Sequence, residues 1–111
     1  VLLSHNTCFD FRRLGIPFEN VRYYDGALNA SDISKDAFLA AHPGVKEKYF
    51  FAPDILIINK TEDPCYSHVP SWKPEFDCTP ASQATAEALR NGTAGYRLLA
   101  ENEYLILYRL P

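Results

Sequence analysis

Polar side chains occur in the sequence where three predicted strands end. The set comprises two histidines, three carboxylates and two amides: His5, Asn6, Asp25, Asn59, Glu62, Asp63 and His68. In an open parallel sheet, ligands bind outside the carboxyl ends of the strands, so these side chains could share one site. A histidine beside carboxylates can exchange protons with a substrate, which makes His5, Asp25 and Asp63 the candidate catalytic residues. Polar residues at strand ends also form turns and helix caps, and this alternative stays open.

Two of the three cysteines, Cys65 and Cys78, flank a segment rich in proline and aromatic residues. A disulfide between them would close that loop and stabilise it by about 3 kcal/mol in the chain-entropy model. His68 lies between the two, but no Cys-x2-Cys pair accompanies it, so we expect no metal. Three free thiols in a cytosolic protein are the alternative.

The third cysteine, Cys8, follows the first predicted strand and lies near a predicted helix N-terminus, where the pKa of a thiol falls. The Cys-x5-Arg spacing of cysteine phosphatases would place an arginine at position 14, where Leu14 stands. We therefore interpret Cys8 as a small buried hydrophobic residue.

Three Asn-x-Ser/Thr triplets begin at Asn29, Asn59 and Asn91, all in predicted loops or at element ends. Such triplets are acceptors for N-linked glycans in secreted proteins. Together with the predicted disulfide they favour an extracytoplasmic location on the secreted, lumenal or periplasmic side. Tyr66 and Trp72 could form a platform for a sugar or a protein partner, or could pack the long loop against the domain.

Hydrophobic patterning predicts a chain of alternating strands and helices that ends in two consecutive strands. The strands are expected over residues 1–4, 20–24, 53–59, 96–100 and 104–109. Residues 53–59 form the longest apolar run and are predicted to be a central strand buried on both faces. The last two strands are separated by three polar residues, which predicts an antiparallel hairpin.

Helix signals lie between these strands. One helix is expected to reach residue 14, and a second to run from Asp32 or Ser34 to residue 42. Thr79-Pro80 predicts the start of a third helix, over residues 80–90, which would lie on the sheet through the small residues Ala81, Ala84 and Ala88. Residues 60–78 are expected to be a long loop without secondary structure. The predicted fold is α/β, a three-layer Rossmann-like sandwich with three parallel strands and a C-terminal antiparallel hairpin.

Composition limits the function classes. The 111 residues are 47% hydrophobic with a net charge of −3, and basic residues form no stripe, so we expect no nucleic-acid partner. No apolar run is long enough for a transmembrane segment. The first strand is followed by no glycine-rich turn, so we expect no nucleotide or other cofactor. The sequence contains no methionine, and we expect a single domain, residues 1–111, cut from a longer protein.

The C-terminal pattern Gly-Tyr-Arg-Leu-Leu at 95–99, followed by Tyr-Leu-Ile-Leu-Tyr-Arg at 104–109, resembles a known family. It is similar to the end of the soluble α/β domains that follow the membrane helices of polytopic GT-C type glycosyltransferases. The Pro-Asp-hydrophobic strand at 53–58 matches those domains too. The catalytic carboxylates of that family lie in membrane-proximal loops, so the resemblance transfers no catalytic residue to this chain. It implies an accessory domain that shapes acceptor access or assembly.

Three functions follow from the sequence. The first is a non-catalytic, extracytoplasmic accessory domain that binds or assembles with a parent membrane protein or another protein. The second is a small hydrolase or transferase that uses His5, Asp25 and Asp63. The third is a secreted carbohydrate-binding domain. The expected contact residues are polar or aromatic: Asn6, Asn59, Glu62, Tyr66, His68 and Trp72.

Overall fold

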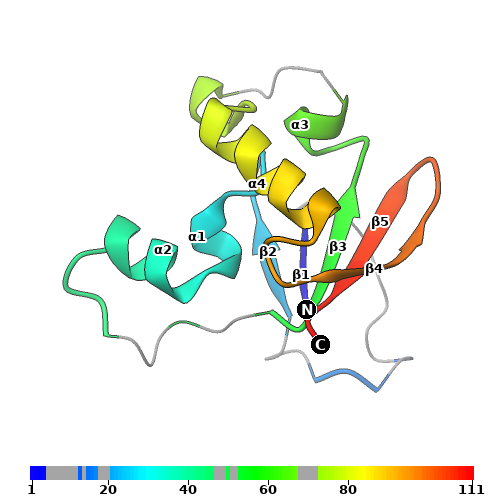
Figure 1. Ribbon diagram of the computed structural model, residues 1–111, viewed down its shortest axis with the longest axis horizontal. Coiled ribbons are helices and arrows are strands. Elements are labelled where there is room, and N and C mark those ends of the chain that lie inside the picture. The colour runs from blue at the N-terminus through cyan, green and yellow to red at the C-terminus, as the bar shows by residue number, and fades with distance from the viewer. Residues whose placement is uncertain (5–12, 14, 18–20, 47–49, 51–52, 68–72) are drawn as a thin grey trace.

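A five-stranded mixed sheet forms the centre of the computed structural model (Figure 1), which describes residues 1–4, 13, 15–17, 21–46, 50, 53–67 and 73–111. The strands are β1 (Leu2–Ser4), β2 (Arg22–Tyr24), β3 (Ile55–Asn59), β4 (Arg97–Glu101) and β5 (Leu105–Arg109). Their order across the sheet is β2-β1-β3-β5-β4. Strand β1 pairs in parallel with β2 and β3, whereas β5 is antiparallel to β3 and β4. The α/β class, the three parallel strands and the C-terminal hairpin are therefore confirmed.

Strand β3 is the central strand that the sequence predicts. It pairs with β1 on one side and with β5 on the other. Leu56 and Ile58 are buried in the larger hydrophobic cluster, and Ile57 is buried in a second cluster with Leu3. Successive side chains of a strand point to opposite faces, so a run of Leu and Ile can fill both. The prediction of a doubly buried strand is confirmed.

The longest helix, α4 (Pro80–Asn91), begins and ends as the sequence predicts. The Thr79 side chain accepts a hydrogen bond from the Ser82 amide, and Pro80 occupies the first helical position. Gly92 terminates the helix with φ 85°, a left-handed conformation that glycine adopts without steric cost. Figure 1 shows α4 crossing in front of the sheet.

The predicted inner face of α4 is wrong. Its buried residues are Ser82, Thr85 and Leu89, whereas Ala81 and Ala84 are exposed. The two sets have helical spacing and differ by one position, which is a rotation of about 100° around the helix axis. Burying Leu89 removes far more apolar surface from water than burying an alanine, and this decides the rotation.

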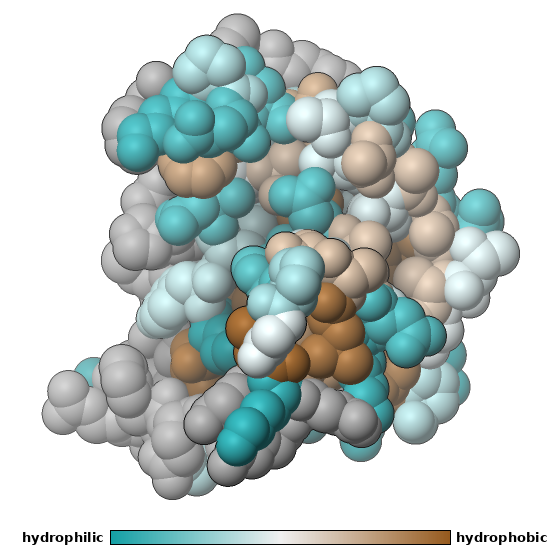
Figure 2. Space-filling view, turned by 90° about the vertical axis from the view of Figure 1, so that its left-hand side faces the viewer, coloured by the Kyte–Doolittle hydropathy of each residue, from teal (hydrophilic) through white to brown (hydrophobic). Residues whose placement is uncertain are grey.

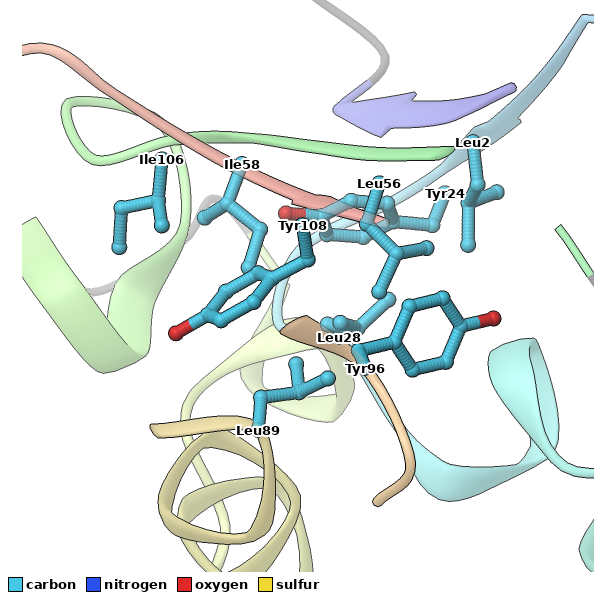
Figure 3. Packing of buried hydrophobic residues seen from close by; sticks show 9 residues of the cluster. All are labelled: Leu2, Tyr24, Leu28, Leu56, Ile58, Leu89, Tyr96, Ile106 and Tyr108. Carbon is cyan, nitrogen blue, oxygen red and sulfur yellow. The ribbon is translucent and has the colours of Figure 1, made fainter. Parts of the chain in front are cut away.

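The main core lies between α4 and the sheet (Figure 3), where Leu89 reaches from the helix toward the strands. Its buried members are Leu2, Tyr24, Leu28, Leu56, Ile58, Leu89, Tyr96, Ile106 and Tyr108. The parallel strands β1, β2 and β3 and the antiparallel strand β5 all supply residues to this core. The core therefore joins the parallel strands and the hairpin into one packed face.

The helix predicted for residues 32–42 is two short helices, α1 (Ala30–Ile33) and α2 (Lys35–Ala41). Ser34 separates them with an extended backbone, and its side chain accepts a hydrogen bond from the Ala37 amide as the N-cap of α2. Ser34 was one of the two predicted start positions. Neither helix contains a buried residue. Figure 2, viewed from this side, shows apolar residues reaching the surface among hydrophilic ones.

The opposite face of the sheet carries the smaller cluster of Leu3 and Ile57. Partly buried residues from several segments pack against it: Val1, Ile16, Val21, Ile55, Leu105 and Leu107. Apart from Arg13, the helix predicted to reach residue 14, which includes Cys8, lies outside the described residues. Within the described chain, no helix is both long and apolar enough to cross a membrane.

Candidate functional site

Asp63 is the centre of the junction that follows β3. Its side chain is fully buried, with 0% exposure, although it is a carboxylate at the end of a strand. Oδ2 accepts hydrogen bonds from the Tyr24 hydroxyl at 2.9 Å and from the Leu28 amide at 3.3 Å. Oδ1 accepts from the Cys65 amide at 3.0 Å. One carboxylate thus joins the end of β2, the loop before α1 and the start of the next helix.

The electrostatics of this group follow from burial. Loss of water raises the pKa of Asp63, and the three hydrogen bonds oppose that rise by stabilising the charged form. Burial, followed by the nearby Asp63 carboxylate, raises the pKa of Tyr24, so its hydroxyl remains a donor at neutral pH. A buried carboxylate with satisfied oxygens is far less costly than an unpaired one.

Helix α3 (Pro64–Ser67) begins directly after Asp63. The Asp63 side chain accepts a hydrogen bond from the Cys65 amide. The backbone carbonyl oxygen of Asp63 accepts hydrogen bonds from the Tyr66 and Ser67 amides. Asp63-Pro64 is therefore a helix start of the same kind as Thr79-Pro80. The expectation of a loop without secondary structure is wrong, because residues 60–78 contain α3 and a short 3-10 helix, η3 (Pro74–Phe76).

A disulfide joins Cys65 in α3 to Cys78, just before α4, with their Cα atoms 4.9 Å apart. The predicted pairing is confirmed. Because both ends of the bridged segment belong to the N-termini of helices, the disulfide holds α3 and α4 at a defined separation. The short sequence separation of 13 residues closes a small loop.

The bridged segment packs back on the end of β2. The amide of Ala27 donates to the carbonyl oxygen of Phe76 at 3.0 Å. Gly26 adopts φ +63°, and a Cβ at this position would overlap the backbone and Cβ of Phe76. Glycine is therefore required here both by the backbone conformation and by the close approach of η3. Phe76 of η3 therefore lies against the turn that follows β2.

The other predicted site residues have different surroundings. Asp25 and Glu62 are exposed. Asn59 is half-buried, and its Oδ1 accepts from the Thr61 amide at 3.0 Å and the Thr61 hydroxyl at 2.6 Å. Tyr66 is half-buried against the main core. Four predicted site residues lie outside the described residues: His5, Asn6, His68 and Trp72.

Sequence reasoning missed the partner of Asp63. The sequence predicts only that Tyr24 lies in a strand, yet it is buried and its hydroxyl bonds to a carboxylate 39 residues away. The available signal was general: a buried tyrosine hydroxyl needs a hydrogen-bond partner. Nothing in the sequence says which partner it finds.

Sequence reasoning also missed a surface ion cluster centred on Glu101. Glu101 of β4 pairs with Lys60 at 2.6 Å and with Arg90 at 2.6 Å. Hydrogen bonds from Arg90 and then Lys60 lower the pKa of Glu101 to about 2. The Lys60 ammonium also donates to the Asn102 carbonyl oxygen at 2.8 Å. This cluster ties the turn after β3 and the end of α4 to the hairpin.

The acidic, histidine and cysteine side chains that the structure describes form no group of three suited to hold a metal ion. Comparison with protein-family models, with curated proteins and with solved structures finds no match to this chain.

Proposed function

We propose that this chain is a non-catalytic accessory domain of a larger extracytoplasmic or membrane protein, and that it serves binding or assembly. The proposal includes the Rossmann-like three-layer arrangement and the relation to GT-C type glycosyltransferases that the C-terminal pattern suggests. One observation carries it: Asp63, one of the three candidate catalytic residues, is buried and holds three segments together.

The surroundings of Asp63 favour an accessory role over the hydrolase or transferase alternative. A general acid or base must lie within hydrogen-bonding reach of its substrate. Asp63 has no exposed surface, and the disulfide-bridged segment packs over the neighbouring turn at Gly26. The carbohydrate-binding alternative relies on exposed stacking rings, and Tyr66 instead packs half-buried against the core.

The extracytoplasmic location is supported by the disulfide between Cys65 and Cys78. Structural disulfides form and persist in oxidising compartments and are rare in the cytosol. The three Asn-x-Ser/Thr triplets favour the same location.

We further propose that the assembly surface is the free edge of β4 and that its occupant is an extended strand of the parent protein. Among the strands of the described residues, β4 pairs with β5 alone, and all five residues of β4 are exposed. Leu98 and Leu99 are each 46% exposed. An edge with free backbone donors and acceptors beside apolar side chains is suited to adding a strand from a partner.

Hydrogen exchange tests the assembly proposal. We would compare the isolated chain with the assembly recovered from its native membrane through a tag on this chain. The amides of residues 97–101 that face away from β5 should become protected on assembly, while those of 105–109 should not change. Equal exchange of residues 97–101 in both samples would exclude this edge as the contact.

The cysteines test the location. Alkylation of the chain from its native cell, under denaturing conditions and without reductant, should find one free thiol among three cysteines. Three free thiols would contradict an oxidising compartment, and adding reductant to a parallel sample provides the control.

A further inference from the structure

Asn91 and its neighbours form an exposed, ordered turn at the end of α4. Asn91 is the last residue of the helix, and Gly92 reverses the backbone with φ 85°. The Asn91 Oδ1 accepts hydrogen bonds from the Thr93 amide at 3.0 Å and from the Thr93 hydroxyl at 2.7 Å. Asn91, Gly92 and Thr93 are all exposed. The fold therefore uses the oxygen of the Asn91 amide group in these contacts and presents the triplet at the surface.

The triplet at Asn59 makes the same hydrogen bonds, but Asn59 is less exposed to solvent than Asn91. Its Oδ1 accepts from the Thr61 amide and hydroxyl, as at Asn91. However, Asn59 is half-buried and is the last residue of the central strand, where it pairs with Leu105 of β5. A bulky substituent has less room there than at the end of a helix.

Asn29 is exposed, like Asn91, but the fold uses both the oxygen and the nitrogen of its amide group. The Asn29 Oδ1 accepts from the Ser82 hydroxyl at 2.7 Å, and its Nδ2 donates to the Ala27 carbonyl oxygen at 3.2 Å. Ser82 is 1% exposed and lies on the buried face of α4. A sugar on Nδ2 would have to fit beside a contact that joins the start of α1 to α4.

From these three environments we propose that Asn91 is the principal N-glycosylation site, that Asn59 is modified less, and that Asn29 remains unmodified. The inference rests on the extracytoplasmic location proposed above. It deepens that proposal by assigning the modified residue and the surface that the glycan covers, beside the Arg90–Glu101 ion pair.

The reaction transfers an oligosaccharide from a lipid-linked donor to the side-chain amide of Asn91. A bond forms between Nδ2 of Asn91 and the anomeric carbon of the sugar, and the bond from that carbon to the diphosphate of a polyprenyl carrier breaks. The diphosphate leaves with the electron pair, and one amide proton passes to solvent. The product keeps the amide oxygen and one N–H, so the bonds from Thr93 to Oδ1 can persist after modification.

The test expresses the whole chain behind a cleavable secretion signal in cells that N-glycosylate, and then maps each asparagine by mass spectrometry after enzymatic glycan release. We expect Asn91→Gln and Thr93→Ala to remove most of the glycan. Thr93→Ser, which preserves the triplet, should retain it. Asn29→Gln should leave the glycan content unchanged. Thermal unfolding of each secreted variant shows whether it is folded.

Occupancy of Asn29 in the folded chain, or occupancy of Asn59 equal to or above that of Asn91, would overturn the assignment. An unmodified Asn91 would do the same. Because the added signal imposes the compartment, these outcomes test the choice of asparagine and not the native location. The thiol measurement on the chain from its native cell tests that location separately.

Discussion

Strands β3 and β4 lie on either side of β5, and each pairs with it. Both are five residues long and both contain adjacent leucine or isoleucine residues. Three of the five residues of β3 are buried, whereas all five residues of β4 are exposed. Strand β3 has a second neighbour, β1, and apolar clusters on both faces. The comparison teaches that apolar content alone does not assign a strand to the interior; its neighbours do.

The two strands also differ in how each uses an acidic side chain. Asp63, which follows β3, is buried and bonds to a tyrosine and two backbone amides. Glu101 of β4 is at the surface and bonds to two cations. Their pKa values accordingly move in opposite directions. The junction after β3 is therefore a structural centre, and the β4 edge is the surface that we propose for assembly.

The largest expected difference in the free energy of unfolding comes from placing a charge in each of the two strands. Ile57→Asp buries an unpaired carboxylate, and we expect it to cost more than about 4 kcal/mol and to abolish cooperative unfolding. Leu99→Asp, in the exposed strand, should cost less than about 1 kcal/mol. Urea unfolding followed by circular dichroism measures both. A cooperative, soluble Ile57→Asp variant would refute the assignment of β3 as central.

Next in size is the loss of the buried carboxylate. Asp63→Ala leaves the Tyr24 hydroxyl and the amides of Leu28 and Cys65 without their acceptor, and we expect a loss of about 3 kcal/mol. Glu103→Ala, an exposed carboxylate in the hairpin turn, is the matched control and should change stability by less than about 0.5 kcal/mol. If Asp63→Ala is as stable as Glu103→Ala, the hydrogen bonds of Asp63 do not stabilise the fold.

Smaller changes in stability are expected from removing either of two buried tyrosine hydroxyls. The two changes should differ in sign. Removing the Tyr24 hydroxyl, which bonds to Asp63, should cost about 1–2 kcal/mol. The Tyr108 hydroxyl is buried and bonds to no group in the described part of the chain. Tyr108→Phe should therefore leave stability unchanged or raise it by up to about 1 kcal/mol. A clear loss in Tyr108→Phe, measured by thermal unfolding, would reveal a partner for that hydroxyl.

The smallest expected effect is the pH dependence of the two acids. The pKa of Glu101 is about 2 in the folded chain against 4.5 without its partners, so its stabilisation is present above pH 4.5 and is lost as pH falls toward 2. The pKa of Asp63 is raised above 3.8, so its titration stabilises the protein at low pH and this contribution is lost as pH rises through the raised value.

Carboxyl NMR titration of the folded chain should find the two values on opposite sides of their ordinary range. Glu101→Gln should reduce the loss of stability between pH 4.5 and 2, and Asp63→Asn should not. If Asp63→Asn reduces the loss of stability on the acid side as Glu101→Gln does, the contrast between the buried and the exposed acid is wrong.

The candidate site was predictable only in part. The sequence identifies Asp63 as a polar residue at a strand end, and Asp63-Pro64 could have predicted the start of α3. It does not identify Tyr24 or Leu28 as partners, because these residues are 39 and 35 positions away and any strand pairing could have separated them.

Local chemistry determined much of the rest. The five strands, the C-terminal hairpin, the start of α4 at Thr79-Pro80, its end at Gly92 and the Cys65–Cys78 bridge all follow from signals within a few residues or from a small number of cysteines. The tertiary structure alone decided which face α4 buries, that Asp63 is enclosed and that β4 remains at the edge. These outcomes depend on which distant segments remove a surface from water, and no local pattern contains that information.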